Sequence, residues 1–437
     1  MLLNFTATNF KTFRDKVTFS MEPAPKQKGL DYSIFTKEVD KKEYKGLSTA
    51  VIYGPNASGK TNIIGAMEAF KNIVLRGNLS NAQIQSPNAS AFQLELIPNS
   101  SLEKAEPVAF GIKFITQDYV IEYSMSLDLG LFLQSDYPRK VLWEELKVNE
   151  KTIFVRDNQL RFESLETITG LLNDSFNDPN DLALFISLAH KGLMDSELFL
   201  MNGFRVIFSS KMAEIISNWL LKKFVVICRA DAIRIKRKPT KENAANIDQF
   251  LTKLAQRFGT DSKALAYLND ENDHNAMVLS SMVKEDGPRG AFIPAELYES
   301  FGTVRFVNMF PLLLETIQEG GTLLVDEFDA SIHPMVIMNI INIFHNDEIN
   351  VNHAQLIFNT HNPIFLNSNL LRRDEIKFVE RDAKTHYSHH YSLSDFGTTG
   401  PNGVRKGEDY LKNYFVDSYG AISEVDFSDF FKNEIEK

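Results

Sequence analysis

The sequence predicts an α/β protein whose main domain is split between residues 1–130 and 291–437, with a mainly helical insertion over residues 131–290. An apolar strand pattern at 47–53 leads into a glycine turn and then a helix pattern. Short buried-strand patterns return only after residue 290, and the segment between has mostly helical apolar spacing. We therefore expect the two ends of the chain to form one domain.

The N-terminal part has a clear order of elements. Apolar and polar residues alternate within 2–20, which predicts two short strands. Residues 22–45 are polar and rich in lysine and proline, so we expect a loop. The strand at 47–53 is followed by helical periodicity at 62–70, and residues 107–130 predict two more strands.

The rest of the chain changes period twice. Helical spacing occurs at 182–186, 215–220 and 247–254. A strand is expected near Ala291, and residues 306–317 predict a helix that contains Pro311. Apolar runs at 323–325 and 356–358 predict buried strands. Residues 379–382 are interpreted as a late strand of the same sheet.

Composition sets limits on the class of protein. The 437 residues are 43% hydrophobic and 24% charged, as in a folded globular protein. The net charge of −10 argues against general affinity for DNA. The single cysteine, Cys228, excludes a disulfide framework. No apolar run is long enough for a membrane helix and no signal peptide is visible, so a cytoplasmic protein without a membrane partner is expected.

Residues 54–61 match the pattern G-x-x-x-x-G-K-[ST] at every fixed position, between a predicted strand and a predicted helix. In such a loop the backbone N–H groups surround the phosphates of a nucleotide, and glycines allow the close approach. Lys60 is placed for the β- and γ-phosphates and Thr61 for Mg²⁺. The alternative is a chance glycine-rich turn. The predicted binding residues are Gly54, Pro55, Asn56, Ala57, Ser58, Gly59, Lys60, Thr61 and Asn62.

A second candidate segment is the apolar strand 323–325, which ends in Asp326 and Glu327. A carboxylate at the C-terminal end of such a strand faces the crevice where nucleotides bind. Asp326 is expected to hold Mg²⁺ and Glu327 to accept a proton from the attacking water. The alternative is a strand that ends in a solvated acidic turn.

The residues that follow carry a family resemblance. Asp326 to Pro334 (DEFDASIHP) resembles the Walker B segment and D-loop of ABC-type ATPases related to SMC proteins and RecF. Asn359 to Asn362 (NTHN) is similar to the H-loop of that family, and Glu299 to Thr303 (ESFGT) to a degenerate signature motif. Asn9 to Phe13 (NFKTF) resembles the family's N-terminal opening. The resemblance covers both ends of the chain and leaves the middle uncovered.

This resemblance implies an ATPase that uses Mg²⁺ and forms a head-to-head dimer, or a larger homo-oligomer, around two ATP molecules. Ser300 and Gly302 of one head are then expected to reach the γ-phosphate held by the other, and His361 to sense it. A plain helix N-cap is the alternative for Ser300, and a surface or core histidine is the alternative for His361. His333, next to Pro334, is expected to be structural. For the glutamine that completes the metal site, Gln93 is the candidate and Gln85 its rival.

Other features bear on the branch of the family. Prolines interrupt the insertion and no C-x-x-C is present, which excludes a long coiled coil or a zinc hook. Too few residues follow Glu380 for the nuclease domain of the related overcoming-lysogenisation-defect proteins. The tail from Leu393 to Ile422 resembles the ending of ATPases from abortive-infection and other phage-defence operons, although Asp417, Ser418 and Ser423 depart from the pattern. A helix packed on the head is the plain alternative for this tail.

The resemblance thus implies an ATP-driven switch that regulates a separately encoded effector, expected to be a nuclease or toxin, in anti-phage defence. The alternative is a RecF- or SMC-like repair ATPase that acts directly on DNA. A basic run over 229–241 could contact nucleic acid or an acidic partner, and a solvated face is the default interpretation. A scaffold that binds ATP without hydrolysis is disfavoured because Glu327 is present.

Overall fold

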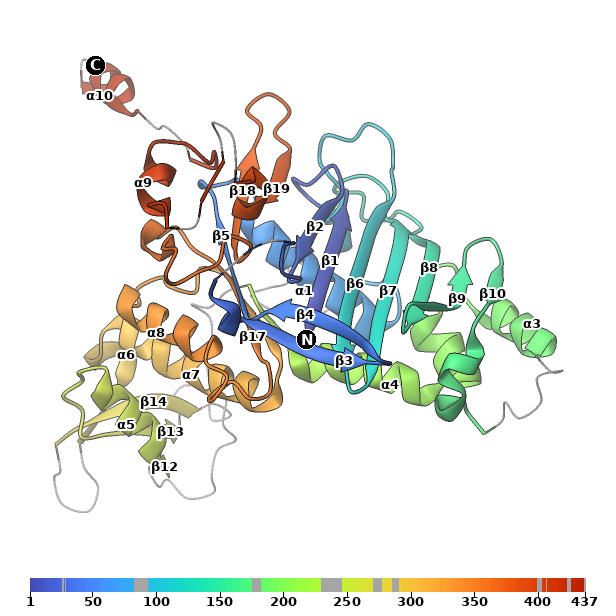
Figure 1. Cartoon of the computed structure of the whole chain (residues 1–437), viewed down its shortest axis with the longest axis horizontal. Coiled ribbons are helices and arrows are strands. Elements are labelled where there is room, and N and C mark those ends of the chain that lie inside the picture. Colours follow the sequence, from blue (N-terminus) through green and yellow to red (C-terminus); the bar gives the residue numbers. More distant parts are fainter. Residues whose placement is uncertain are drawn as a thin grey trace.

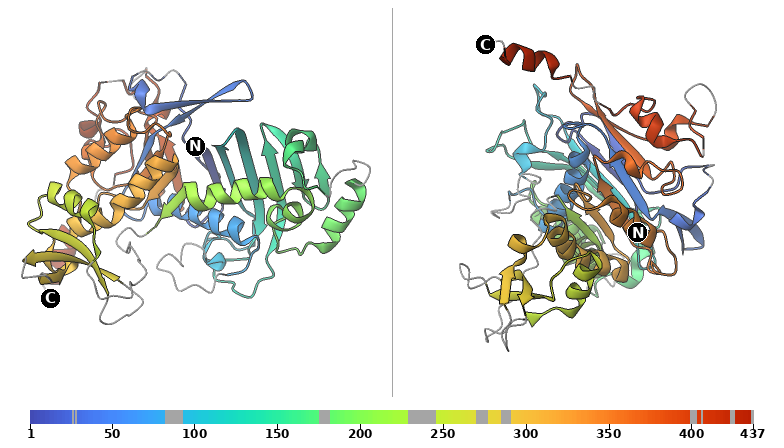
Figure 2. Two further views of the ribbon diagram at one scale, coloured as in Figure 1. Left: turned by 90° about the horizontal axis from the view of Figure 1, so that it is seen from below. Right: turned by 90° about the vertical axis from the view of Figure 1, so that its left-hand side faces the viewer.

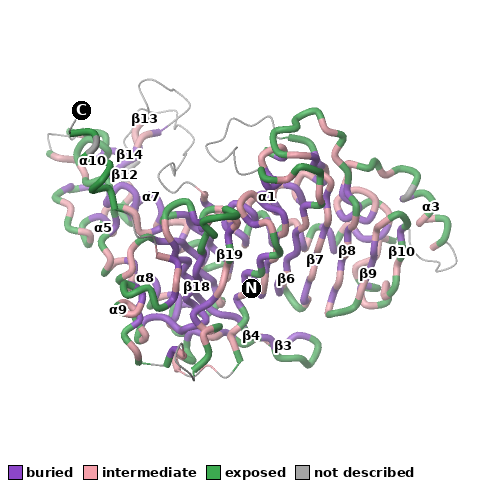
Figure 3. The backbone as a smooth tube through the Cα atoms, turned by 90° about the horizontal axis from the view of Figure 1, so that it is seen from above, coloured by how far each residue is buried: buried purple, intermediate pink, exposed green. Residues whose placement is uncertain are grey.

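A computed structural model describes residues 1–25, 27, 29–81, 93–174, 182–228, 246–269, 277–284, 291–398, 403–405, 407–422 and 426–435. Two large sheets lie next to each other, and their strands include many of the buried residues (Figures 1 and 3). The basic run at 229–241 lies outside the described residues. Among the described residues, no helix has the length and apolar character needed to cross a membrane.

The six-stranded sheet joins the two ends of the chain. Its order is β11 (Phe224–Ile227), β16 (Thr322–Val325), β17 (Gln355–Asn359), β5 (Thr49–Tyr53), β18 (Ile376–Arg381) and β19 (Ser388–Ser392). All neighbours pair in parallel except β18 and β19. Strands β5, β16 and β17 are buried along their whole length, as expected for a parallel sheet covered on both faces. Since β5 lies between β17 and β18, the predicted split α/β fold is confirmed.

The second large sheet is antiparallel throughout. Its order is β10 (Leu160–Phe162), β9 (Lys151–Arg156), β8 (Lys140–Val148), β7 (Tyr119–Asp128), β6 (Val108–Thr116), β1 (Leu2–Thr8) and β2 (Val17–Ser20). Helix α1 (Lys60–Arg76) packs against both large sheets, because one hydrophobic cluster joins its Phe70 to Phe5 of β1 and Ile52 of β5. This packing fixes the start of α1, where the phosphate loop ends.

The structure differs from the prediction of a mainly helical segment over 131–290. Strands β8, β9 and β10 extend the antiparallel sheet, and β11 forms the edge of the parallel sheet. The alternating burial of β8 is the period-two pattern of a strand with one covered face. The helical segments of this region include η3 (Leu165–Leu171), α3 (Leu182–Gly192), η5 (Leu200–Phe208), α4 (Ser210–Asn218) and η6 (Trp219–Lys223). The α4 region runs along the antiparallel sheet, where Trp219 stacks on Phe114 (Figure 2, left).

A second difference concerns the loop predicted at 22–45. Residues Ile34–Val39 (β3) and Lys42–Leu47 (β4) form an antiparallel hairpin. The two turn residues, Asp40 and Lys41, both have positive φ values, of 50° and 63°. That is the backbone of a two-residue hairpin turn, whose twist matches the strands. The lysine-rich composition of this segment is more typical of a loop, so the sequence pattern does not predict the hairpin.

A small sheet lies on the side of the molecule away from the seven-stranded sheet (Figure 1). It contains β12 (Asn246–Ile247), β13 (Ala264–Asn269), β14 (Met277–Lys284) and β15 (Ala291–Pro294). Helix α5 (Gln249–Arg257) packs on it, and their common core includes Val304 and Val307 of the long helix α7 (Phe301–Glu319). The short helix α6 (Ala295–Tyr298) precedes α7, and α8 (Pro334–Phe344) follows β16.

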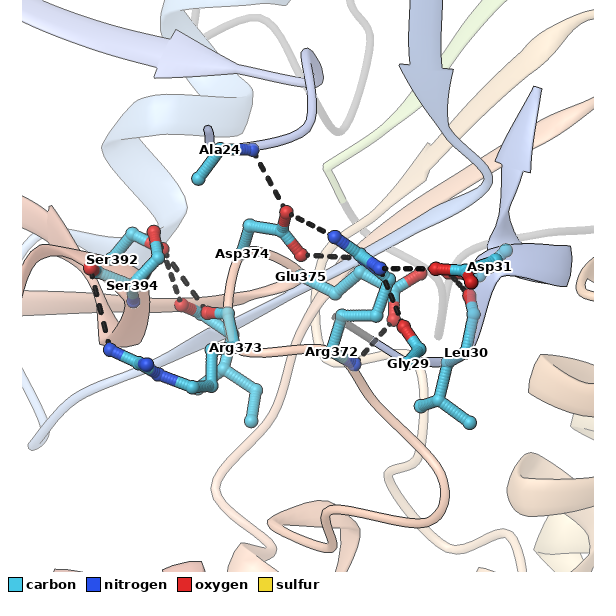
Figure 4. A network of polar contacts seen from close by, with 12 residues as sticks. Ala24, Gly29, Leu30, Asp31, Arg372, Arg373, Asp374, Glu375, Ser392 and Ser394 are labelled. Carbon is cyan, nitrogen blue, oxygen red and sulfur yellow. Dashed lines mark hydrogen bonds and ion pairs between the residues drawn. The ribbon is translucent and has the colours of Figure 1, made fainter. Parts of the chain in front are cut away.

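Polar contacts tie the N-terminal segment to the C-terminal lobe (Figure 4). The Arg372 guanidinium pairs with Asp374, at 2.9 Å, and donates to the carbonyl of Gly29. The second carboxylate oxygen of Asp374 accepts from the backbone N–H of Ala24. The ends of the chain are therefore joined by these hydrogen bonds and by an ion pair of Arg372 with Asp31, at 3.7 Å, as well as by strands.

The tail packs on the head, which confirms the plain interpretation of this segment. Helix α9 (Tyr410–Phe415) places Tyr414 on Phe378 of β18, with 6.1 Å between ring centroids. Tyr419 and Ala421 belong to the same core. Helix α10 (Ser428–Ile435) extends away from the body and is exposed (Figures 1 and 3).

Candidate functional site

The loop between β5 and α1 depends on its glycines. Gly54 has a φ of 154°, and a Cβ there would lie 2.2 Å from the backbone carbonyl oxygen of Val379. Gly59 has a φ of 108°, and a Cβ there would lie within 3 Å of the hydroxyls of Ser388 and Thr12. Side chains at these two positions would push the loop away from β18 and β19. The motif therefore has a structural basis in this fold.

This loop forms one wall of a hollow of about 220 Å³. The hollow is lined by residues 56–62 together with Glu327, Asn359 and His361. Three segments that are far apart in the sequence meet there, because β5, β16 and β17 are parallel neighbours and end at the same edge of the sheet. The proximity of the phosphate loop, Glu327 and His361 thus follows from the sheet order.

Lys60 lies folded back on the loop. Its Nζ donates to the carbonyl oxygens of Gly54, at 2.7 Å, and Pro55, at 2.9 Å. The residue is only 5% exposed, and burial lowers the pKa of Lys60 to about 8 against the opposing attraction of Asp326 and Glu327. An anion in the hollow would favour the charged ammonium form.

ATP binding is expected to weaken by about tenfold per pH unit above a pH of about 8. Below this pH, Lys60 is an ammonium in the free protein as well as in the complex, so affinity should not change. Above it, free Lys60 is neutral, and binding must take up a proton. Titration with ATP from about pH 7 to about pH 10 checks this. Lys60→Arg, whose guanidinium stays charged, should give a flat profile over that range; a flat wild-type profile would contradict the expectation.

Asp326 is joined to the hollow through Thr61, one of the residues that line it. The Thr61 hydroxyl donates to Asp326 Oδ1 at 3.0 Å, and the Asn359 side-chain amide donates to the same oxygen. Burial raises the pKa of Asp326, although both hydrogen bonds oppose the rise. A hydroxyl and a carboxylate side by side are oxygen donors of the kind that Mg²⁺ accepts. These residues fit a magnesium ion in chemistry.

Glu327 is exposed although it follows the buried strand β16. Its backbone is left-handed, with a φ of 50°. Its side chain lines the hollow, whereas Phe328 turns into the core with an exposure of 0%. The turn after β16 thus presents one carboxylate to the crevice.

His361 also lines the hollow and comes just after β17. Burial lowers the pKa of His361, and Lys60 lowers it further, while Glu327 and Asp329 act in the other direction. A neutral imidazole can donate to an anion through one ring nitrogen and accept at the other. His333, in contrast, caps α8 by accepting from the Met335 backbone at 3.2 Å, in keeping with a structural role.

The signature residues Ser300 and Gly302 do not line this hollow. The exposed Ser300 caps α7, where its Oγ accepts from the backbone N–H of Thr303 at 3.1 Å. Gly302 is buried against the D-loop, and a Cβ there would lie 2.1 Å from the carbonyl oxygen of Ser331. Within one chain these residues have structural contacts, and their action on a second head stays a prediction.

Gly302→Ala is expected to lower the free energy of unfolding by about 1–3 kcal/mol, because a Cβ would overlap backbone that cannot move aside. Gly65→Ala is the matched control within α1, where a Cβ would meet nothing within 4 Å. This control should raise stability by about 0.5–1 kcal/mol through helix propensity. Thermal unfolding of both variants is the measurement. Equal or higher stability of Gly302→Ala would show that α7 and the D-loop are not in this contact in solution.

Gln93 is not brought to the hollow, which differs from the prediction of a metal-site glutamine. It is exposed and precedes the short helix η2 (Leu94–Leu96). The buried side chains of Leu94 and Ile97 anchor this segment in the core, so Gln93 lies outside. The rival, Gln85, lies outside the described residues.

A larger pocket, of about 350 Å³, adjoins the hollow at Asn62, which lines both. Its lining also includes Lys11 and Thr12, and the Asn62 amide donates to the Thr12 hydroxyl at 2.8 Å. Leu96 and Phe132 add apolar surface, and Arg381 a positive charge. No role for this pocket was predicted. The NFKTF segment contains two of its lining residues, Lys11 and Thr12, but the contact of Thr12 with Asn62 forms only in the folded chain.

Sequence reasoning also missed the roles of Asn359 and Arg305. Asn359 was noted only as part of a histidine motif, yet it binds both Asp326 and Glu327. Arg305 donates to the carbonyl oxygen of Glu327 from α7. A polar residue at the end of a buried strand was the available signal for Asn359. Arg305 had no comparable signal.

Comparison with known proteins gives a family match that covers most of the chain. A family model described as "AAA domain, putative AbiEii toxin, Type IV TA system" matches residues 50–367, which include the phosphate loop, the acidic pair and His361. Among solved structures, the chain is similar to the SMC head domain from Thermotoga maritima, with 12% identity, a TM-score of 0.34, and coverage of 90% of this chain and 98% of that one. No curated protein matches. Because the family model spans most of the chain, from the phosphate loop to His361, the protein belongs to this family of AAA-domain ATPases.

Proposed function

We propose that the protein binds and hydrolyses ATP with Mg²⁺, and that ATP closes a dimer of two heads that controls a separate effector in anti-phage defence. The observation that carries the catalytic part is that Lys60, Thr61 and Glu327 line one hollow, with Asp326 hydrogen-bonded to Thr61. An ammonium, a magnesium-binding pair and an exposed carboxylate are the groups that phosphoryl transfer to water requires.

ATP would extend from the hollow into the adjoining pocket. The phosphates lie at the loop backbone and the N-terminus of α1, where main-chain N–H groups and the helix dipole favour negative charge. Asn62 is common to both spaces, and so the nucleoside lies beside Lys11, Thr12 and Phe132.

Hydrolysis would use this chain's residues in separate roles. Lys60 moves from its two loop carbonyls to the β- and γ-phosphates. Mg²⁺ bound at Thr61 and Asp326 would neutralise phosphate charge. Glu327 accepts the proton of the attacking water, and His361 contacts the γ-phosphate.

Dimerisation is supported by the exposed residues at the start of α7, which lie outside the hollow of the single chain. Ser300 is exposed at the N-terminus of the long helix α7, and the side chain of Phe301 is 59% exposed next to it. A second head that covers these residues would bury apolar surface and bring a phosphate to a helix N-terminus. The effector part has a different basis. It rests on the family description, which names a toxin and a TA system, and on the tail motif.

The test is ATP hydrolysis by the purified protein with Mg²⁺ and with EDTA, followed by addition of DNA or of the product of the neighbouring gene. Magnesium-dependent phosphate release supports the ATPase, and an ATP-dependent complex with the neighbouring protein supports the effector role. DNA-stimulated hydrolysis with salt-sensitive DNA binding would replace that role by the repair function. Absence of both hydrolysis and ATP binding would overturn the proposal.

A further inference from the structure

The main chain at Glu327 is held in an unfavourable conformation. A φ of 50° is left-handed, a region that glutamate rarely adopts. A residue keeps such a conformation only where its surroundings fix it. Two side chains from different elements form hydrogen bonds with the backbone of this residue. Asn359 accepts from its N–H, and Arg305 donates to its carbonyl oxygen.

Asn359 makes two contacts that require an amide. Its Oδ1 accepts from the Glu327 N–H at 2.5 Å, and its Nδ2 donates to the Asp326 carboxylate. The residue is 1% exposed at the end of β17, next to β16. A carboxylate there could not donate to Asp326. The side chain of serine or threonine is shorter and would not place its hydroxyl where the Asn359 amide lies.

Arg305 binds the carbonyl side of Glu327. It is 7% exposed on α7, and its guanidinium donates to the Glu327 carbonyl oxygen. The same helix touches the end of this turn, where Gly302 packs on the Ser331 carbonyl. Helix α7 therefore contacts the turn from Glu327 to Ser331 at both ends.

We propose that Asn359 and Arg305 are positioning residues for hydrolysis, which together hold the Glu327 main chain so that its carboxylate faces the hollow. The inference rests on the proposed ATPase function. Because Arg305 lies five residues after Ser300 on the same helix, it also links the Glu327 turn to the surface that a second head would contact. Asn359 lines the hollow, whereas Arg305 does not.

The test separates positioning from binding. Arg305→Met keeps the length of the side chain without a donor, and Arg305→Lys restores one donor. Arg305→Met and Asn359→Leu should each lower kcat by about 10–100-fold, as expected for a misplaced reacting group. In Arg305→Met, whose side chain lies outside the lining of the hollow, the Kd for a non-hydrolysable ATP analogue should stay within about threefold of wild type. Arg305→Lys should recover most of the lost kcat. Arg373→Met is the matched control, since buried Arg373 donates to the Gly397 carbonyl at 2.6 Å, away from the hollow; it should lower thermal stability and leave kcat unchanged.

The outcomes distinguish this inference from the proposed function. Wild-type protein that fails to hydrolyse ATP overturns the proposed function and the inference together. Wild-type hydrolysis with unchanged kcat in Arg305→Met and Asn359→Leu overturns the inference alone. The inference is also overturned if Arg305→Lys is as impaired as Arg305→Met, or if the loss in Arg305→Met appears in analogue binding rather than in kcat.

Discussion

Lys60→Ala is expected to weaken ATP binding by about 10²–10³-fold and to remove measurable hydrolysis. Lys60 is the one cation in the lining of the hollow, apart from a protonated His361, among the residues that the structure describes. Removing a buried charged partner of a phosphate costs about 2–5 kcal/mol, and each 1.4 kcal/mol is about a factor of ten in affinity. Titration with a fluorescent ATP analogue and an assay of phosphate release measure the two effects.

The matched control is Lys71→Ala on the same helix. Lys71 is also partly buried, but its Nζ donates to the Phe224 carbonyl at 2.8 Å, and it does not line the hollow. The control should lose some stability and keep its ATP affinity. Equal ATP affinity of Lys60→Ala and wild type would mean that phosphates are not bound at this loop.

The parts of the site that the sequence predicts are those encoded in short segments. The phosphate loop has fixed glycines because β18 and β19 approach its backbone, and these glycines stand next to Lys60 and Thr61 in the chain. Asp326 and Glu327 follow a fully buried strand directly. A local pattern is sufficient where one turn carries both the geometry and the reactive groups.

The missed parts depend on contacts between distant segments. Asn359 binds Glu327 across two strand ends, and Arg305 reaches the same residue from a helix 22 positions earlier. Gln93 was expected near the metal because of its residue type, but burial of Leu94 and Ile97 decides its direction.

The middle of the chain shows a related limit of periodicity. Burial alternates in β8, but its residue types do not alternate in the same way, because the charged Glu144 is fully buried. The more regular helical spacing nearby therefore predicts helices for the whole segment. Sheet pairing with β7 determines the structure of β8, and this pairing is a tertiary property.

Glu327→Gln is expected to lower the rate of ATP hydrolysis by about 10²–10⁴-fold, the usual contribution of a general base, with little loss of ATP affinity. Glutamine keeps the size of the side chain and the backbone contacts of residue 327 to Asn359 and Arg305. It cannot take a proton from water. Phosphate release and analogue binding should therefore separate, in contrast to Lys60→Ala, where both fall.

The same variant tests whether ATP closes a dimer. If Ser300 and Phe301 of one head cover the nucleotide of another, slow hydrolysis should prolong the closed state, and the mass of Glu327→Gln should double with ATP and return to that of the monomer with ADP. Combining Glu327→Gln with Phe301→Glu supplies the control, because a carboxylate at this exposed position would oppose burial near phosphates while leaving the single-chain hollow intact. A Glu327→Gln protein that binds ATP and stays a monomer would confine the mechanism to one head. Hydrolysis at the wild-type rate would instead assign the base to another residue, and the strained backbone of Glu327 would then need a different explanation.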